Sequence, residues 1–546
     1  MKQYAHPVSC QIESLEDRTL LTATFPEFVD PHPSADNGFG DSVVPLSTGN
    51  VVITAPWDDT GGANAGAVYL YNGVTGELIS TLTGSTDDDR LGNEGITALA
   101  SGNFVISSSY WDNGSINDAG AVTLGNGDTG VSGTVSAANS LVGTDHQDYL
   151  GRVNNDGTGG VTALSNGNYV VSNPNWDNGT QQDAGAVTFG NGTTGVTGVI
   201  STNNSLVGSS HYDSVGASGV TLLTNGNYIV SSPAWDLVFV DNGGREDLIK
   251  NVGAVTLGNS STGVTGVITS ENSLLGSQRD DYVGGMYLGY SGVQTLSNGN
   301  YVVSSPYWNN GEASQAGAVT FGNGTTGSTG FVSADNSLVG FSTNDRVGCI
   351  EFYNGVSWES SITVLSSGSY IISSPYWDNG SVNNAGAVTF GNGSTGVSGV
   401  ISASNSLVGS TANDEVGGWE HGGLTSITEL ANGNFVISSP TWDNGAAADA
   451  GAVTFGDGTI GVSGVLSATN SLVGSTNDEQ VGLLDYYGHS FITTLANGSY
   501  VVSSPFWDND GAADAGAVTF GDGTTGIAGV ISASNSLVGT TSDDRR

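Results

Sequence analysis

The sequence predicts an all-β protein in which about eight four-stranded antiparallel blades form a β-propeller. The 546 residues include 85 Gly and only 11% charged residues, which is typical of short strands joined by tight turns. Long helical patterns are missing, and one unit recurs through almost the whole chain at intervals of 54 to 73 residues. Such a period predicts a repeat architecture. The Trp that ends a Ser-Ser-Pro-like segment marks the copies at Trp57, Trp111, Trp176, Trp235, Trp308, Trp377, Trp442 and Trp507.

The seventh unit illustrates the expected blade. Apolar and polar residues alternate over residues 427–430, and Asn432-Gly433-Asn434 forms a turn. Further strands are expected over residues 435–438, 451–455 and 464–473, again separated by Gly-rich turns. Four short strands joined in this way predict an antiparallel meander.

A single thin sheet cannot bury both of its faces, whereas eight sheets arranged radially can. A seven-bladed ring with a spare unit and a β-solenoid remain as alternatives. A unit of about 65 residues favours the blade, because solenoid coils usually have about 20 to 30 residues. The expected organisation is an N-terminal segment over residues 1–35 and a propeller over residues 36–546. The eight units are expected at residues 36–90, 91–149, 150–214, 215–282, 283–346, 347–415, 416–480 and 481–546.

The first 35 residues lie outside the repeat. Residues 13–23, Glu-Ser-Leu-Glu-Asp-Arg-Thr-Leu-Leu-Thr-Ala, resemble the LEPR-XLL motif near the N-terminus of large bacterial proteins, with Asp17 where the motif has Pro. The resemblance implies an exported, cell-surface or extracellular protein. A short amphipathic helix is the alternative interpretation of this stretch.

The first unit carries a second resemblance. Phe39-Gly40-Asp41-Ser42-Val43-Val44 precedes Ala55-Pro56 and then Gly66-Ala67-Val68-Tyr69-Leu70-Tyr71. This succession resembles the FG-GAP repeats of integrin α-type β-propellers, and later units are similar to a bacterial propeller repeat of unknown function. The resemblance implies a propeller fold. The Asp-x-Asp-x-Asp-Gly calcium loop of that family is replaced here by Asn-Gly-Asn or Ser-Gly-Ser, so calcium binding at that place is not expected.

The charge is strongly acidic, with 52 Asp and Glu against 10 Lys and Arg and a formal net charge of −42. A surface of this sign repels nucleic-acid phosphates and anionic lipid headgroups. No run of 18 apolar residues occurs, so no membrane insertion is expected. We expect a monomeric propeller in a medium whose counterions screen its self-repulsion; solubility alone is the simpler explanation of the acidity.

Residues repeated in every unit are expected to belong to the scaffold. The Trp is expected to pack between blades rather than to stack on a ligand. An acidic residue lies two positions before each junction Val or Leu, and it has two interpretations: it caps the turn with hydrogen bonds, or it binds a cation. These residues are Asp89, Asp148, Asp213, Asp281, Asp345, Asp414 and Glu479.

Residues that vary between units are the candidates for function. Blades five to eight place aromatic and polar residues on connections that open on one face, and the fourth blade carries a long insert over residues 237–251. Aromatic rings stack on sugars while carboxylates and amides bind hydroxyls, so this rim is a candidate glycan-binding surface. Packing of the loops on each other is the alternative. The candidates are Tyr287, Tyr290, Phe352, Tyr353, Trp358, Trp419, Glu420, His421, Tyr486 and Tyr487.

Two acidic loops are candidate calcium sites, because Ca²⁺ takes six to eight oxygen ligands in tolerant geometry. Their residues are Asp443, Asp449, Asp508, Asp510 and Asp514. No other cofactor is expected.

No catalytic constellation is expected. The sequence favours a non-enzymatic, exported or surface-associated module that binds a glycan or a surface protein. A polysaccharide lyase or glycoside hydrolase that uses Glu351, Glu359, Glu420 or Asp485 is one alternative. A purely structural envelope repeat is the other.

Overall fold

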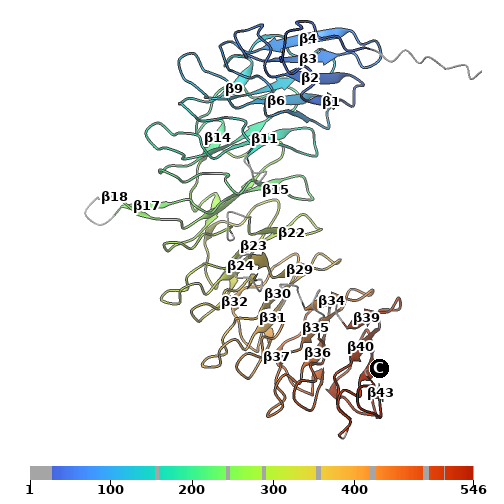
Figure 1. Ribbon diagram of the computed structural model, residues 1–546. Helices are drawn as coiled ribbons and strands as arrows, with labels where there is room; N and C mark the ends of the chain where they lie inside the picture. Colours follow the sequence, from blue (N-terminus) through green and yellow to red (C-terminus); the bar gives the residue numbers. More distant parts are fainter. Residues whose placement is uncertain are drawn as a thin grey trace, which may run out of the picture.

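The computed structural model describes residues 27–153, 159–240, 246–285, 291–351, 358–418, 426–483, 491–509 and 511–544. Over these ranges the regular secondary structure consists of β-strands, and no helix occurs. The sheets of the eight repeats follow one another in a curved, open stack, with the first and last repeats at opposite ends (Figure 1). The predicted all-β class and the eight repeats are confirmed.

Each repeat contributes four strands to its own sheet. They are β1 (Val43–Pro45), β2 (Val51–Ala55), β3 (Ala67–Tyr71) and β4 (Leu78–Thr83) in the first repeat; β5 (Ile96–Ala98), β6 (Phe104–Ser108), β7 (Ala121–Gly125) and β9 (Ser140–Val142) in the second; β10 (Gly160–Ala163), β11 (Tyr169–Asn173), β12 (Ala186–Gly190) and β14 (Ser205–Val207) in the third; and β15 (Val220–Leu222), β16 (Tyr228–Ser232), β19 (Ala254–Gly258) and β21 (Ser273–Leu275) in the fourth. The fifth has β22 (Val293–Thr295), β23 (Tyr301–Ser305), β24 (Ala318–Gly322) and β26 (Ser337–Val339); the sixth β29 (Ile362–Val364), β30 (Tyr370–Ser374), β31 (Ala387–Gly391) and β33 (Ser406–Val408); the seventh β34 (Ile427–Glu429), β35 (Phe435–Ser439), β36 (Ala452–Gly456) and β38 (Ser471–Val473); and the eighth β39 (Ile492–Thr494), β40 (Tyr500–Ser504), β41 (Ala517–Gly521) and β43 (Ser536–Val538).

The recurring sequence explains the central pair of each sheet. In the seventh repeat, Gly433 turns the chain between β34 and β35 with φ of +85°, a conformation that glycine adopts without strain. Phe435 at the start of β35 lies opposite Gly456 at the end of β36. A Cβ on Gly456 would lie 2.2 Å from the Phe435 ring, so the glycine is required for the ring to cover the neighbouring strand.

Consecutive sheets are joined by short strands that the sequence did not reveal. Residues 464–473 were expected to form one strand, but only Ser471–Val473 (β38) joins the sheet of its own repeat. Residues Gly464–Val465 (β37) pair in parallel with β33 of the preceding repeat. The same linking strand recurs as β8 (Gly133–Thr134), β13 (Gly198–Val199), β20 (Gly266–Val267), β25 (Gly330–Phe331), β32 (Gly399–Val400) and β42 (Gly529–Val530).

The hydrophobic core lies between neighbouring sheets. In one example, Val436, Val453 and Leu472 of the seventh repeat pack against Tyr500, Val502 and Ile531 of the eighth. The side chains of Leu472 and Tyr500 are fully buried. Each interior repeat thus packs with its leading face on the repeat before it and with its trailing face on the repeat after it, and both neighbours stabilise its sheet.

The closed ring expected from the repeat length is not the arrangement seen in Figure 1, where the two terminal repeats are far apart. Face-to-face packing of sheets occurs in a propeller and in an open stack alike. The angle between successive sheets decides whether the stack closes, and repeat length does not determine that angle.

The insert of the fourth repeat forms a hairpin of β17 (Leu237–Val240) and β18 (Glu246–Ile249) that projects from the stack (Figure 1). Lys250 at its base forms an ion pair with Asp236. The sixth repeat begins with a second hairpin, β27 (Cys349–Glu351) and β28 (Trp358–Ser360).

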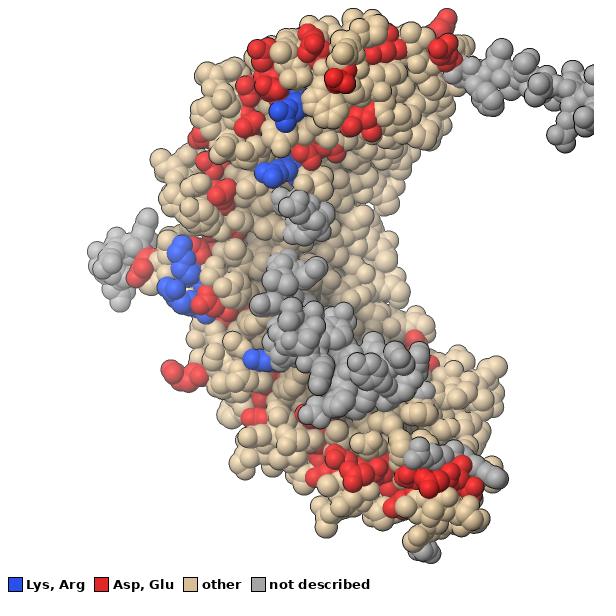
Figure 2. Space-filling model, in the orientation of Figure 1, with Lys and Arg blue, Asp and Glu red and all other residues tan. Residues whose placement is uncertain are grey.

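Acidic side chains are prominent toward both ends of the face shown in Figure 2, and basic side chains are few. In the part of the chain that the structure describes, no helix is long and apolar enough to cross a bilayer.

Candidate ligand-binding site

Seven of the eight recurring tryptophans belong to the scaffold, as predicted. From Trp111 to Trp507 their exposed fractions are only 3–5%, whereas Trp57 is 41% exposed. The indole Nε1 of Trp111 donates to Ser85 Oγ at 3.1 Å, and that of Trp176 donates to Thr144 Oγ1 at 3.1 Å. Both acceptors belong to the preceding repeat, so these rings pack at the junction between sheets.

Trp57 is not equivalent to the other seven. After β6, the Trp111 N–H donates to Ser108 O, and Trp111 O accepts from Gly120 N. After β2 the same two bonds are made by Asp58, with Ala55 O and Gly66 N. Trp57 therefore occupies the position of Tyr110, one residue before the buried Trp. The sequence interpretation that aligned Trp57 with the other seven is corrected by one position.

Asp58 fills the buried position because the first repeat has a different leading face. Its carboxylate is fully buried and accepts the Tyr69 hydroxyl at 2.8 Å. Burial, together with this carboxylate, raises the pKa of Tyr69. In the later repeats Thr stands in place of Tyr69 and Gly in place of Tyr71, as in Thr454 and Gly456 of β36.

Residues 27–39 cover this leading face. Phe28 packs edge-on against Tyr71 with ring centroids 5.5 Å apart, and the Tyr71 hydroxyl donates to Val29 O at 2.7 Å. Burial raises the pKa of Tyr71 to about 12. Phe39 lies 5.8 Å from the Tyr69 ring, centroid to centroid. We call residues 27–39 the N-terminal cap.

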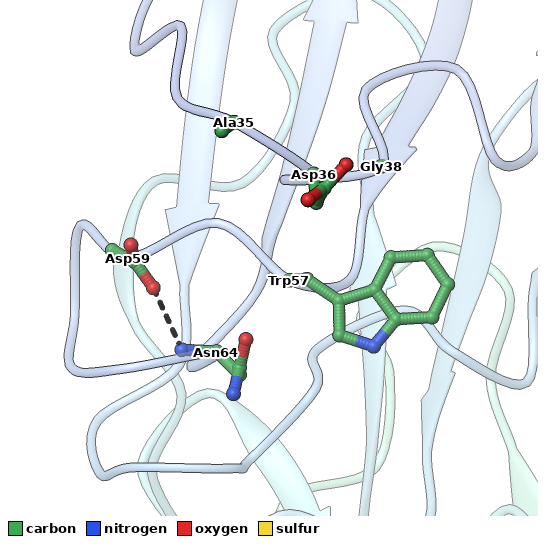
Figure 3. A pocket seen from close by; sticks show the side chains of 6 residues that line it. All are labelled: Ala35, Asp36, Gly38, Trp57, Asp59 and Asn64. Atoms are coloured by element: carbon green, nitrogen blue, oxygen red, sulfur yellow. Dashed lines mark hydrogen bonds between the residues drawn. The ribbon is translucent and has the colours of Figure 1, made fainter.

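An open pocket of about 570 Å³ lies where the cap meets the loop after β2 (Figure 3). The indole of Trp57 lies on one side of it, with Asp36, Asp59 and Asn64 around the space beside the ring. Its volume is within the range of small-molecule sites, about 300–1,000 Å³. The lining residues are Ala35, Asp36, Gly38, Trp57, Asp59 and Asn64.

Backbone contacts hold the pocket residues in place. The Trp57 N–H donates to Asn37 O at 3.1 Å, and a Cβ on Gly38 would lie 2.3 Å from Cε3 of the indole. The Asn64 N–H donates to Asp59 Oδ1 at 2.9 Å. Gly38 with φ of +71° brings the cap backbone against the ring. The indole is thus supported by the cap while one part stays exposed.

The pocket surroundings are acidic. Besides Asp36 and Asp59, the Asn64 Nδ2 donates to Asp88 Oδ1 at 3.1 Å. Asp88 also lies 3.5 Å from the Arg90 guanidinium; the Asp88 side chain is exposed and that of Arg90 is partly exposed. An aromatic ring beside carboxylates and an amide offers a stacking face and hydrogen-bond acceptors. Such a set suits a neutral polyhydroxyl ring and disfavours an anion.

The position of Trp57 is aromatic in four later repeats as well, where Tyr110, Tyr307, Tyr376 and Phe506 are each partly exposed. Tyr110 packs edge-on against Tyr149, with ring centroids 6.1 Å apart. The Arg90 Cζ lies over the Tyr110 ring, 5.2 Å from its centroid. In the other three repeats this position holds Asn175, Ala234 and Thr441.

The junction acidic residues cap turns, which confirms the first of their two interpretations. Asp213 is fully buried, and its Oδ2 accepts the N–H groups of Ser209 and Ser210 at 2.7 and 2.8 Å. Its Oδ1 accepts the Asp236 N–H of the next repeat at 2.9 Å. Burial raises the pKa of Asp213 to about 7, although these bonds oppose the shift. The same cause raises the pKa of Asp148 and of Asp345 to about 6.

The predicted rim lies almost entirely outside the described residues. This applies to Tyr287, Tyr290, Phe352, Tyr353, Trp419, Glu420, His421, Tyr486 and Tyr487, and to Asp485 among the rival catalytic carboxylates. Glu351 lies in β27, and Trp358 and Glu359 lie in β28; the structure describes only the backbone of these three residues. The rim stays a prediction.

The proposed calcium ligands have structural roles where they are described. Asp443 Oδ1 accepts the Asp449 N–H at 2.9 Å, and Asp508 Oδ1 accepts the Asp514 N–H at 2.9 Å. Asp510 lies outside the described residues. Across the described ranges, no three His, Cys, Asp or Glu side chains gather as metal ligands do. Calcium binding stays a prediction.

Sequence reasoning missed the Trp57 pocket, although one signal was present. Trp57 follows Pro56 directly, whereas one residue separates Pro from Trp in Pro233-Ala234-Trp235 and Pro440-Thr441-Trp442. That difference of one residue moves the ring from the junction to the surface.

Comparison with solved structures gives only weak likenesses. A crystal structure described as a eukaryotic initiation factor is 9% identical with a TM-score of 0.27, over 95% of this chain and 91% of that one. A putative 6-phosphogluconolactonase from Bacteroides uniformis is 10% identical with a TM-score of 0.24, over 68% and 87%. Neither supports a functional argument. No functionally curated protein matches the chain.

One family model matches the chain eight times. Its description is "Repeat of unknown function (DUF5650)", and the matched residues are 45–93, 98–152, 163–217, 222–285, 295–349, 364–418, 429–483 and 494–546. These segments together cover most of the chain and include the central strands of every sheet. The chain belongs to the DUF5650 repeat family.

Proposed function

We propose that this protein is a non-enzymatic binding scaffold that recognises a neutral glycan, with its first contact at the Trp57 pocket. The observation that carries the proposal is the exposure of Trp57, 41% against 3–5% for the seven buried tryptophans. The exposed ring lies beside Asp36, Asp59 and Asn64 in a pocket of about 570 Å³. Stacking on the indole and hydrogen bonds from sugar hydroxyls would hold one ring.

The aromatic residues at the same position in later repeats support a polymeric ligand. Face-to-face sheets are spaced about 10 Å apart, so neighbouring positions recur at short intervals along the stack. Tyr110 is the nearest of them to Trp57 in the chain, followed after a gap by Tyr307 and Tyr376. A glycan chain that contacts several of them gains affinity from multivalency.

The proposal includes an exported or cell-surface location and an adhesive role. The LEPR-XLL-like stretch at residues 13–23 supports export, and the FG-GAP-like residues 39–44 of the first repeat support kinship with adhesion proteins. The large negative charge is compatible with a calcium-containing medium. Calcium would then support the acidic loops rather than the pocket.

The test is a titration of the full chain with neutral oligosaccharides of increasing length, selected on a glycan array. Trp57→Ala is expected to weaken binding at least tenfold, because it removes the stacking face. Asp36→Asn is expected to weaken it less. Asn is among the residues that tolerate the positive φ of 61° at this position, so this variant keeps the backbone intact.

Phe341→Ala is the matched control, because Phe341 is 69% exposed and lies in a different part of the array. Its affinity is expected to equal that of the unchanged protein. If Trp57→Ala bound the glycan with the affinity of the unchanged protein, the proposal would be contradicted. Release of shortened glycan during the titration would contradict it as well, because the protein would then be an enzyme. Repeating the titration with chelator separates the calcium expectation from the pocket.

A further inference from the structure

A second cavity, of about 250 Å³, lies at the base of the hairpin β17–β18 and is lined by residues of the third, fourth and fifth repeats. Trp235, Ile268 and Leu275 are buried and form its inner part, whereas Val238 and Phe331 are exposed and border its opening. Its volume is below the range of sites that hold a whole small molecule, about 300–1,000 Å³. The cavity therefore fits one substituent of a larger ligand.

Three departures from the repeat pattern meet at this cavity. Leu237 and Val238 belong to the insert of the fourth repeat. Leu275 ends β21, where the corresponding strands of the second, third and fifth to eighth repeats end in Val. Phe331 pairs with Leu275 from the linking strand β25, and the other linking strands have Thr or Val in its place. The other repeats form the common scaffold without these side chains, so their presence here is open to a role in binding.

The indole N–H of Trp235 is a buried donor beside the cavity. In the second repeat the equivalent N–H, of Trp111, donates to Ser85 Oγ. Ser209 is equivalent to Ser85 and lines the cavity, but Trp235 Nε1 has no acceptor among the described residues. A buried donor without an acceptor is unfavourable, so a ligand oxygen that accepts from this N–H gains affinity. Four later tryptophans also lack an acceptor, although none of them lines this cavity: Trp308, Trp377, Trp442 and Trp507.

We propose that this cavity binds the acetamido group of an N-acetylated amino sugar. The acetyl methyl group packs on Ile268 and Leu275, and the carbonyl oxygen accepts the Trp235 N–H. The exposed Phe331 ring stacks on a face of the sugar. The hydroxyl groups of Thr269 and Ser270, which line the same cavity, are suited to hydrogen bonds with the sugar hydroxyls. This site is separate from the Trp57 pocket, so either can bind without the other.

The chemistry of the lining favours an acetamido group over two simpler substituents. A hydrocarbon group fills the apolar part of the cavity but leaves the Trp235 N–H without an acceptor. A carboxylate supplies an acceptor, but no basic side chain lines the cavity to compensate its charge. An acetamido group combines a small apolar end with a neutral acceptor.

Saturation-transfer NMR of the full chain with two methyl glycosides tests the proposal. The first probe is methyl N-acetyl-β-glucosaminide, and the second is methyl β-glucoside, which has a hydroxyl in place of the acetamido group. The acetyl methyl protons are expected to receive the strongest saturation, because they lie deepest in the cavity. The second probe is expected to bind about tenfold more weakly or worse, because it leaves the Trp235 N–H unpaired. Equal affinity for the two probes, stronger saturation of the ring protons, or no binding of the first probe would overturn the proposal.

Two matched variants locate the site. Phe331→Ala is expected to weaken binding of the first probe about fivefold or more, because it removes the stacking face. Thr134 stands at the equivalent place in β8, so the linking strand is expected to form without the ring. Val400→Ala is the control, since Val400 has the same place in β32 and is 40% exposed, against 42% for Phe331. Its affinity is expected to equal that of the unchanged protein. Unchanged binding by Phe331→Ala would overturn the proposal.

Trp57→Ala separates this site from the glycan contact proposed above. It is expected to leave the affinity for the first probe unchanged, because Trp57 does not line this cavity. Loss of that binding in Trp57→Ala would assign the acetamido group to the Trp57 pocket and would overturn the present proposal. Neutral oligosaccharides whose binding does not depend on Trp57 would contradict the proposed function alone.

Discussion

The first and last repeats each form a sheet with the same order of their own four strands, but they end the stack in different ways. The first repeat replaces Thr and Gly of the common β-strand by Tyr69 and Tyr71 and covers them with the N-terminal cap. The last repeat keeps the common Ala-Val-Thr-Phe-Gly strand, and its Phe520 and Leu537 are exposed. The comparison shows that the first repeat has substitutions that let its leading face pack against its own chain, whereas the eighth repeat keeps the interior sequence on its trailing face.

Removal of a ring under the cap is expected to have the largest effect. Tyr71 is 1% exposed and contacts Phe28 and Val29. Tyr71→Ala is expected to reduce the free energy of unfolding of the first repeat by about 3–5 kcal/mol. Urea unfolding of the full chain measures it, with Val74→Ala, at an 82% exposed position, as control. Equal effects of the two changes would show that the cap contributes little to stability.

The same substitution at equivalent positions of neighbouring repeats compares a buried trailing face in the seventh repeat with the exposed trailing face of the eighth. Leu472→Ala removes a fully buried side chain and is expected to reduce the free energy of unfolding by about 2–5 kcal/mol. Leu537→Ala, at an 80% exposed position, is expected to change it by less than about 0.5 kcal/mol in dilute protein. A similar loss at both positions in urea unfolding would contradict the difference between the faces.

The buried junction carboxylates predict how stability depends on pH. The pKa of Asp213 is about 7 in the folded chain, above the value of about 4 in an unfolded chain. Between these values the folded state holds more protons, so the free energy of unfolding is expected to fall as pH rises from about 4 to about 7. Urea midpoints at pH 5 and pH 8, in high salt to screen the general repulsion, measure this.

Asp213→Asn separates this carboxylate from the others. It removes one of the two oxygens that accept backbone N–H groups, so a loss of about 1–3 kcal/mol is expected at pH 5. The dependence on pH is expected to become weaker at the same time. An unchanged pH profile would show that Asp213 does not titrate in this range.

The smallest expected effect concerns the bonds between adjacent repeats. Asn225 and Asn227 both donate to Gly324 O, at 2.8 and 2.9 Å. The sixth repeat has Ser367 and Ser369 at these positions, and the serine side chain is shorter. Asn227→Ser is expected to reduce the free energy of unfolding by about 0.5–1.5 kcal/mol, and Ser369→Asn to raise it slightly. In urea unfolding, a higher free energy of unfolding for Asn227→Ser or a lower one for Ser369→Asn would contradict this role.

Much of the fold could be predicted because local chemistry determines it. The turn at Gly433 and the alternation in β35 are visible in the sequence. Closure of the stack could not be predicted, because it depends on small angles between sheets. The split of residues 464–473 between two sheets depends equally on contacts with another repeat.

The candidate site could be predicted only in part. The burial of seven tryptophans followed from their repetition, and the turn-capping role of Asp213 followed from its place before a junction. The Trp57 pocket depends on a shift of one residue after Pro56 and on contact with the cap. Neither feature recurs in the other repeats, so the repeat pattern could not predict the pocket.

Hydrogen exchange of the full chain in dilute solution tests the central claim most directly, because protection reports the local stability of each sheet. Strands β40, β41 and β43 of the eighth repeat are expected to exchange faster than the equivalent strands β35, β36 and β38 of the seventh, while β2 and β3 under the cap stay protected. Equal protection of the seventh and eighth sheets would contradict the account, because a sheet with an exposed trailing face would then be as stable as one packed on both faces.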